Sequence, residues 1–208
     1  AIFAPAEIKW LEIEAQILDG DDGWEDIADH IFTSIQINIK PKLAEDLAGN
    51  YRIYGWFNDT NHTKWSDSGK IHEENYGFGT SIDQQLTDIF TIFGRYSWQE
   101  PEVYAAGADF SLEHSWSTGC QLLGKPWGRE DDYIGLAFGM DMPSDDYKKA
   151  TSRKCNDESH FETYYSCRIN DNLTLSPDIQ IIWDAYGKDV AGRDDTITVI
   201  GCRGQVDF

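Results

Sequence analysis

Long apolar runs are absent from this sequence of 208 residues. No stretch of about 18 consecutive apolar residues occurs, which excludes a transmembrane helix, and the mean hydropathy is −0.52. A transmembrane β-barrel remains compatible with these values, because its strands alternate apolar and polar residues and their hydropathy averages out.

Positive charge is also scarce. The chain has 17 Lys and Arg against 37 Asp and Glu, which gives a net charge of −20. Nucleic acids and anionic lipid surfaces attract positively charged proteins, so the composition argues against both as partners. An acidic protein whose charges lie in loops and in a water-filled lumen still fits a membrane barrel.

The motifs of several chemistries are missing. His62, His72, His114 and His160 occur singly, without an HExxH pair. No G-x-S-x-G element occurs, and Gly77-Phe78-Gly79 precedes no phosphate-binding helix. We therefore expect no metal site, no cofactor and no enzymatic activity. The first residues, Ala1 to Pro5, lack the basic and apolar regions of a signal peptide, so we expect a mature sequence or one without its N-terminal part.

A period of two recurs along the whole chain and predicts β-strands. Between Leu173 and Ile181, apolar residues fall on one face and polar residues on the other. The pattern predicts about ten strands. Their ranges are 7–18, 32–40, 50–58, 77–85, 88–98, 110–124, 132–142, 161–169, 173–183 and 196–208.

The connections between these strands alternate in length. The short ones are Pro41–Gly49, Leu86–Thr87, Lys125–Asp131 and Asn170–Asn172. The long ones are Asp19–Ile31, Asp59–Tyr76, Gln99–Asp109, Pro143–His160 and Asp184–Asp195. Short turns on one rim and long loops on the other are typical of an antiparallel up-and-down transmembrane β-barrel in a bacterial outer membrane.

The C-terminus supports the same interpretation. The last strand is amphipathic and ends on the aromatic Phe208. Barrel assembly machinery characteristically recognises such an ending, so we expect that machinery as a partner. Placing Phe208 at the periplasmic rim puts every short turn on the periplasmic side and every long loop outside.

Alternation also predicts which side chains face the lumen. A charge on the lipid face at mid-depth costs roughly 2–4 kcal/mol, so Arg52 and Arg95 are predicted to point inward. The candidate pore-lining residues are Arg52, Tyr54, Trp56, Asp83, Arg95, Glu113, Glu162, Arg168, Asp178 and Arg203. For any one arginine, pairing with a lumen carboxylate is as good an explanation as contact with a solute.

The four cysteines form no CxxC pair and no zinc spacing. Cys120, Cys167 and Cys202 fall on the predicted lipid-facing side, where a thiol serves as a small apolar group. Cys155 falls in a long loop, too far from Cys167 for a disulfide. We therefore expect four unpaired cysteines.

Several stretches resemble the carbohydrate-selective porin family, the OprB type. They are Gly20–Asp26, Gly49–Trp56, Gly77–Asp88, Phe93–Trp98, Gly124–Asp132, Gly135–Gly139, Leu173–Gln180 and Arg203–Phe208. The resemblance covers the C-terminal part of the family's pattern, and family members are larger barrels. It implies an outer-membrane porin that passes carbohydrates and other small hydrophilic solutes, with outer-membrane lipid around it and a homo-oligomer as one possibility.

Alternatives stay open at this stage. A soluble all-β, lectin-like module would show similar alternation, and a barrel lipase would need a serine and a histidine at the rim. The acidic loop Asp19–Asp29 is a weak calcium candidate, because it lacks EF-hand spacing. The ten strands could close alone into a narrow barrel. Given the partial resemblance, we instead expect a single porin domain, 1–208, forming part of a larger barrel.

Overall fold

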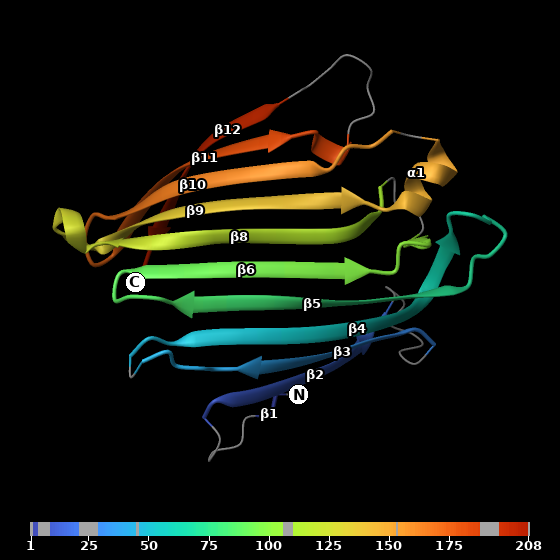
Figure 1. Cartoon of the computed structure of the whole chain (residues 1–208), viewed down its shortest axis with the longest axis horizontal. Coiled ribbons are helices and arrows are strands. Elements are labelled where there is room, and N and C mark those ends of the chain that lie inside the picture. Colours follow the sequence, from blue (N-terminus) through green and yellow to red (C-terminus); the bar gives the residue numbers. More distant parts are fainter. Residues whose placement is uncertain are drawn as a thin grey trace.

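The computed structural model describes residues 2–3, 9–20, 29–44, 46–105, 110–152, 154–187 and 196–207. Its strands form one antiparallel sheet, and Figure 1 shows them side by side in chain order, apart from β7. The strands are β1 (Ile2–Phe3), β2 (Leu11–Asp19), β3 (Ile31–Ile39), β4 (Gly49–Lys64), β5 (Glu73–Gln85), β6 (Phe90–Gln99), β7 (Val103–Ala105), β8 (Leu112–Gly124), β9 (Arg129–Pro143), β10 (Glu158–Arg168), β11 (Leu173–Trp183) and β12 (Ile197–Val206). The helical segments are η1 (Lys125–Trp127), α1 (Asp145–Thr151) and η2 (Ala185–Gly187).

All the predicted strands are present, and the up-and-down order is confirmed. Their alternating connections lie at opposite ends of the sheet, which we call the short-turn end and the long-loop end (Figure 1). At the short-turn end, Leu86 N–H donates to the Phe90 carbonyl at 2.8 Å and Ile169 N–H to the Leu173 carbonyl at 2.9 Å, closing two hairpins.

Several predicted boundaries were wrong, mostly at the long-loop end. β4 continues to Lys64 and β5 begins at Glu73, so the connection predicted as Asp59–Tyr76 is much shorter. At the short-turn end, β9 begins at Arg129, inside the predicted turn. Alternation weakens where both faces of a strand become polar. This explains why the polar ends of β4, β5 and β9 were not predicted as strand.

The predicted loops also contain structure that alternation does not reveal. β7 lies within the predicted loop Gln99–Asp109 and pairs with β4 over His62–Lys64. Helix α1 lies within the predicted loop Pro143–His160, and its N-cap Ser144 accepts a hydrogen bond from the Tyr147 backbone N–H at 3.0 Å. Such a cap is worth about 1 kcal/mol to a short helix.

A small aromatic core holds the long-loop end together. Trp65 stacks on Tyr104 with ring centroids 4.0 Å apart, and Tyr147 of α1 meets Trp65 edge-on at 5.1 Å. Tyr147 is fully buried. The described part of the chain contains few other buried apolar side chains, because the sheet has no second layer packed on it.

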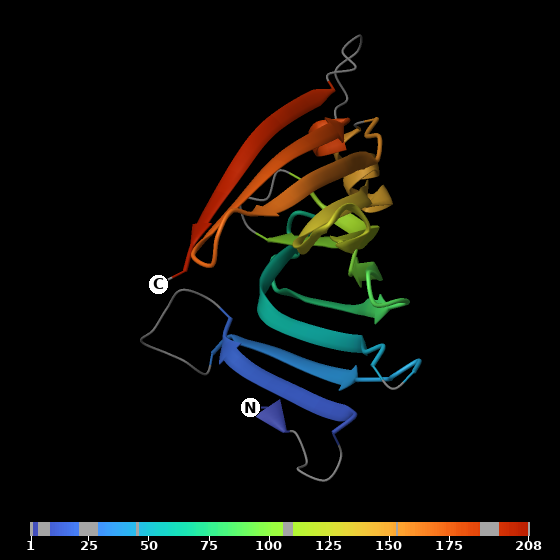
Figure 2. The same ribbon diagram turned by 90° about the vertical axis from the view of Figure 1, so that its left-hand side faces the viewer.

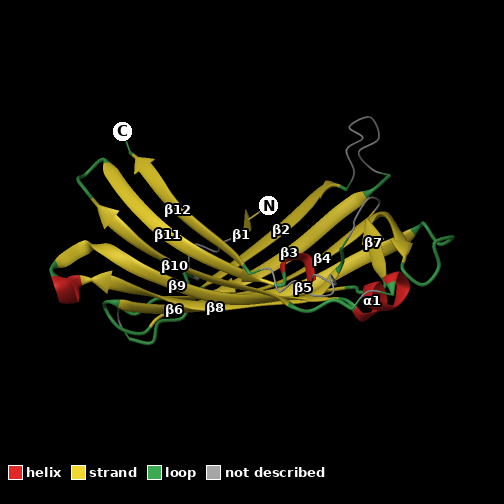
Figure 3. Ribbon diagram, turned by 90° about the horizontal axis from the view of Figure 1, so that it is seen from above, coloured by secondary structure: helices red, strands yellow, loops and turns green. Residues whose placement is uncertain are grey.

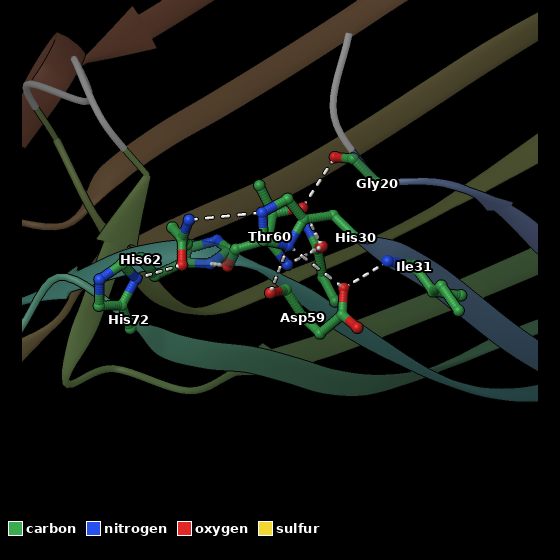
Figure 4. A network of polar contacts seen from close by, with 9 residues as sticks. Gly20, His30, Ile31, Asp59, Thr60, His62 and His72 are labelled. Atoms are coloured by element: carbon green, nitrogen blue, oxygen red, sulfur yellow. Dashed lines mark hydrogen bonds and ion pairs between the residues drawn. The ribbon is translucent and has the colours of Figure 1, made fainter. Parts of the chain in front are cut away.

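A polar network ties β2, β3 and β4 together at the same end (Figure 4). The Thr60 hydroxyl donates to the Gly20 carbonyl at 2.8 Å, and the Ile31 N–H donates to the Asp59 carboxylate. Asn61 joins His30 and His72, with contacts of 3.4 and 2.7 Å. The bonds of Thr60 and Asp59 satisfy backbone groups where β2 ends and β3 begins.

The sheet is strongly curved, as Figures 2 and 3 show from two directions. Among the described residues, β2 pairs with β3 and β1, and β12 pairs with β11 alone. The ten long strands therefore do not close on themselves through β2 and β12. Backbone groups left open in lipid cost several kcal/mol each, so the partners of these two edges matter for any membrane-spanning form.

One face of the sheet is apolar and exposed. We call it the convex face; Ile53 on it is 63% exposed and Ile200 is 80% exposed. Towards the long-loop end it carries an aromatic belt of Tyr76, Phe78, Trp98, Trp116, Phe138 and Trp183, in which neighbouring rings lie 5.5–6.4 Å apart. An apolar band bordered by aromatic rings matches the lipid-facing surface of an outer-membrane barrel.

In the described residues no helix has the length and apolar character needed to cross a membrane. Cys120, Cys167 and Cys202 lie on the convex face as predicted, and no disulfide joins any of the four described cysteines.

Candidate pore-lining face

The opposite face of the sheet is polar, and we call it the concave face. Each row of paired residues crosses the strands without changing face, so the register decides which side chains meet. One row runs from Asn38 through Arg52, Ser81 and Arg95 to Ser117. Every residue in it is polar, which shows that alternation stays in phase across five strands.

All ten candidate residues lie on this face. They come from β4 (Arg52, Tyr54, Trp56), β5 (Asp83), β6 (Arg95), β8 (Glu113), β10 (Glu162, Arg168), β11 (Asp178) and β12 (Arg203). Their side chains do not form one compact site. They divide into groups along the curved wall.

The first group lies on β4 and β5. The Arg52 guanidinium donates to Asp83 at 2.7 Å across the strand boundary. Both side chains are about one third exposed, so solvent still screens the pair. For Arg52, pairing with a lumen carboxylate is therefore the observed arrangement.

Arg95 differs from Arg52. Its guanidinium lies over the Phe93 ring, 4.9 Å from the ring centroid, and its side chain is exposed. Among the described residues, no carboxylate lies within ion-pair distance of it. Arg95 therefore offers hydrogen-bond donors to whatever occupies the space in front of the concave face.

The aromatic side chains of the wall lie flat over glycines. A Cβ atom on Gly79 would come within 2.4 Å of the Tyr54 ring, and one on Gly77 within 2.8 Å of Trp56. Tyr164 covers Gly135 in the same way, at 2.3 Å. The missing Cβ atoms let these rings lie along the sheet instead of projecting from it.

A second group surrounds a cavity of about 380 Å³ on β9 to β12. Its wall combines Glu162, Arg168, Asp178 and Arg203, all predicted, with residues that were not among the ten candidates. These include Tyr133, Tyr164, Gln180 and Gln205. Arg168 forms ion pairs with Asp131 at 3.2 Å and Asp171 at 3.1 Å.

The remaining candidates lie at the edges of these groups. Tyr54 and Trp56 line a hollow together with Glu14, Gln16 and Gln36. Glu113 lies near His114, 3.3 Å from its ring nitrogen, at the start of β8. Arg95 and Glu162 share a further hollow with Ser115, Asp141 and His160.

Sequence reasoning missed His160 and Asp141 as neighbours. In the sequence His160 stands alone among metal-binding motifs, although it alternates in phase with Glu162. Its closeness to Asp141 depends on the register between β9 and β10, where Glu158 pairs directly with Asp141. Single-strand patterns do not contain that information. Most of the loop Asp19–Asp29, the weak calcium candidate of the sequence, lies outside the described residues.

The arrangement of the concave face suits a solvated wall. Donors, acceptors and aromatic faces alternate along a curved polar surface, while the other face is apolar. Such a wall can replace part of the hydration shell of a polar solute.

Comparison with known proteins agrees with this architecture. The family model of the carbohydrate-selective porins, OprB family, matches residues 11–208. A search of curated proteins finds no match. The high-pH structure of Pseudomonas putida OprB superposes with a TM-score of 0.83 at 16% sequence identity. The alignment covers 100% of this chain and 57% of that one. The chain therefore belongs to the carbohydrate-selective porin family, OprB, whose members are β-barrels of the bacterial outer membrane.

Proposed function

We propose that the protein lets carbohydrates and other small hydrophilic solutes diffuse passively across the outer membrane. The concave face would be part of the wall of a water-filled pore. One observation carries the proposal: every candidate lumen residue lies on the concave face, while the convex face exposes isoleucine and aromatic side chains.

The side chains of the wall match the chemistry of a sugar. Hydroxyl groups need paired donors and acceptors, which Arg95, Glu162 and Gln180 supply. The C–H faces of a sugar ring stack on aromatic side chains, and Tyr54 and Trp56 lie flat on the wall. The proposed role involves no covalent step and no cofactor, so we do not expect enzymatic activity.

A complete pore would use strands beyond those of this chain. The chain spans 57% of the length of the solved porin that it matches, and both edges of its sheet lack a further partner among the described residues. We propose that residues 1–208 form one continuous part of a larger barrel. The exposed apolar face disfavours a soluble lectin-like module, since soluble proteins rarely expose so large an apolar surface.

The remaining partners are proposals of the same kind. The convex face would contact outer-membrane lipid, and the long-loop end would face outwards. Phe208 would be the residue recognised by the barrel assembly machinery, although it lies outside the described residues. Association with further copies of the protein stays a prediction.

Proteoliposome swelling tests the function. We expect the full protein to admit a hexose faster than a zwitterionic amino acid of similar size. Trp56→Ala should reduce that preference a few-fold, because the aromatic surface for the sugar ring is lost. Phe57→Ala, on the convex face of the same strand, is the matched control and should leave the preference unchanged. Equal swelling rates for both solutes in the unmodified protein would contradict the proposal.

A further inference from the structure

Three side chains with metal-binding chemistry meet on the concave face, near the long-loop end. They are Asp141 of β9 and Glu158 and His160 of β10. Asp141 and Glu158 are direct cross-strand partners, and His160 follows two residues later on the same face. Paired positions in an antiparallel sheet bring Cβ atoms to about 5 Å, so the register itself brings these side chains together.

The three groups converge on one point. The His160 Nε2 atom lies 2.5 Å from Glu158 Oε1 and 3.9 Å from Asp141 Oδ2. One ligand atom of each residue lies within 4.8 Å of the other two. All three side chains are partly exposed, so a solute in front of the wall can reach them.

In each carboxylate, the oxygen that points away from His160 accepts a hydrogen bond that holds the side chain in place. The Ser115 hydroxyl of β8 donates to Asp141 Oδ1 at 2.5 Å, which leaves Oδ2 turned towards His160. The Tyr186 backbone N–H donates to Glu158 Oε2, which leaves Oε1 turned towards the same ring. Outer partners of this kind orient the ligands of metal sites. Their presence distinguishes this cluster from carboxylates that are merely close together.

We propose that Asp141, Glu158 and His160 bind a divalent transition metal ion, with Zn²⁺ as the best match. One imidazole and two carboxylates suit zinc better than calcium or magnesium, which prefer all-oxygen sites. Three protein ligands leave a coordination position open towards the concave face for water or a solute.

The site lies beside residues that the pore proposal already uses. Arg95 and Glu162 line the same hollow as Asp141 and His160. An ion there would neutralise two carboxylates close to the long-loop mouth. It would thereby change the charge that solutes meet as they enter. This consequence rests on the proposed function, whereas metal binding itself does not.

Calorimetric titration of the full, detergent-purified protein with Zn²⁺ tests the site. We expect one ion per chain at this position. Losing a ligand should cost at least as much as losing an outer partner, so His160→Ala should weaken binding roughly 100-fold. Ser115→Ala should weaken it about tenfold, because Asp141 loses the group that orients it. His72→Ala, an exposed histidine at the same end of the sheet, is the control and should change nothing.

A second measurement separates the loss of a metal ligand from misfolding of the variant. Asp141→Asn is nearly isosteric and can keep its bond to Ser115, and heat-modifiable gel migration reports whether the barrel forms. Co²⁺ bound in place of Zn²⁺ should give visible absorption bands that disappear in folded Asp141→Asn. The proposal is overturned if His160→Ala and Asp141→Asn bind Zn²⁺ as tightly as His72→Ala. That result would leave sugar diffusion, measured by swelling, unaffected.

Discussion

At the scale of single residues, Asp132 is a buried carboxylate that accepts four hydrogen bonds. It is buried on the convex face near the short-turn end. It accepts hydrogen bonds from Arg129 at 2.7 and 3.1 Å, from the Tyr165 hydroxyl at 2.6 Å and from the Arg168 backbone N–H at 2.9 Å. These hydrogen bonds connect the beginning of β9 to the end of β10.

We predict that Asp132→Ala destabilises the barrel. Hydrogen bonds to charged groups are the stronger kind, and the substitution removes several at once. The temperature at which the heat-modified form appears should fall by roughly 5–10 °C. Asp131→Ala is the matched control: Asp131 is exposed and forms an ion pair with the half-exposed Arg168, so little change is expected. A fall of equal size in both variants would show that the buried network is not the cause.

A second residue-scale prediction concerns the glycines beneath aromatic rings. Gly79→Ala places a methyl group about where the Tyr54 ring lies, so the ring must move off the wall. Overpacking of this kind costs roughly 1–3 kcal/mol. Gly94→Ala is the control, because a Cβ atom there meets nothing within 4 Å. Urea unfolding in lipid vesicles measures both. Equal stability of the two variants would contradict the observed packing.

At the scale of elements, an ion pair joins two neighbouring turns. Lys125 of η1 donates to Asp88, in the turn between β5 and β6, at 2.7 Å. The hydrogen bond and charge of Lys125 lower the pKa of the Asp88 carboxyl. A carboxyl group with a lowered pKa in the folded state stabilises the fold above its ordinary pKa. That contribution is lost as the pH falls through the lowered value.

We expect Lys125→Met to raise the pKa of Asp88 towards its ordinary value. NMR titration of the Asp88 carboxyl carbon measures this directly. Lys70→Met, at the opposite end of the sheet, should leave that titration unchanged. An Asp88 pKa that is the same in all three proteins would show that the two turns do not interact in solution.

The elements also show how far sequence reasoning reaches. Alternation identifies β11 from Leu173 to Trp183 with the correct bounds, because one face is apolar and the other is polar along most of its length. It fails at Lys64 and Glu73, where β4 and β5 extend past the apolar band. It also misses α1 and β7, since a short helix held by Ser144 and one strand pairing with β4 leave no periodic signal.

The candidate site was predictable to a similar extent. Parity along each strand places Arg52 and Arg95 on the concave face, where the structure has them. It does not say that Arg52 pairs with Asp83, whereas Arg95 lies over Phe93. It also does not bring His160 next to Asp141. Those contacts follow from register and side-chain orientation, which depend on neighbouring strands rather than on the strand itself.

At the scale of the whole molecule, the sheet is a curved wall with a polar and an apolar face. Among the described residues its edges are β1 with β2 on one side and β12 on the other, and in the proposed larger barrel further strands would pair there. The row through Arg52, Ser81, Arg95 and Ser117 lies on the polar face, and the adjoining residues Thr80 and Thr118 point to the other. The central claim is that the concave face lines a water-filled pore.

Cysteine labelling during channel recording tests that claim most directly. In a background in which the four native cysteines are replaced, Ser81→Cys and Ser117→Cys should each react with a charged, water-soluble thiosulfonate. Conductance of the full protein in a planar bilayer should then fall in steps. Thr80→Cys and Thr118→Cys, one position away on the convex face, should conduct unchanged after the same treatment. Block through the threonine positions and none through the serine positions would contradict the account.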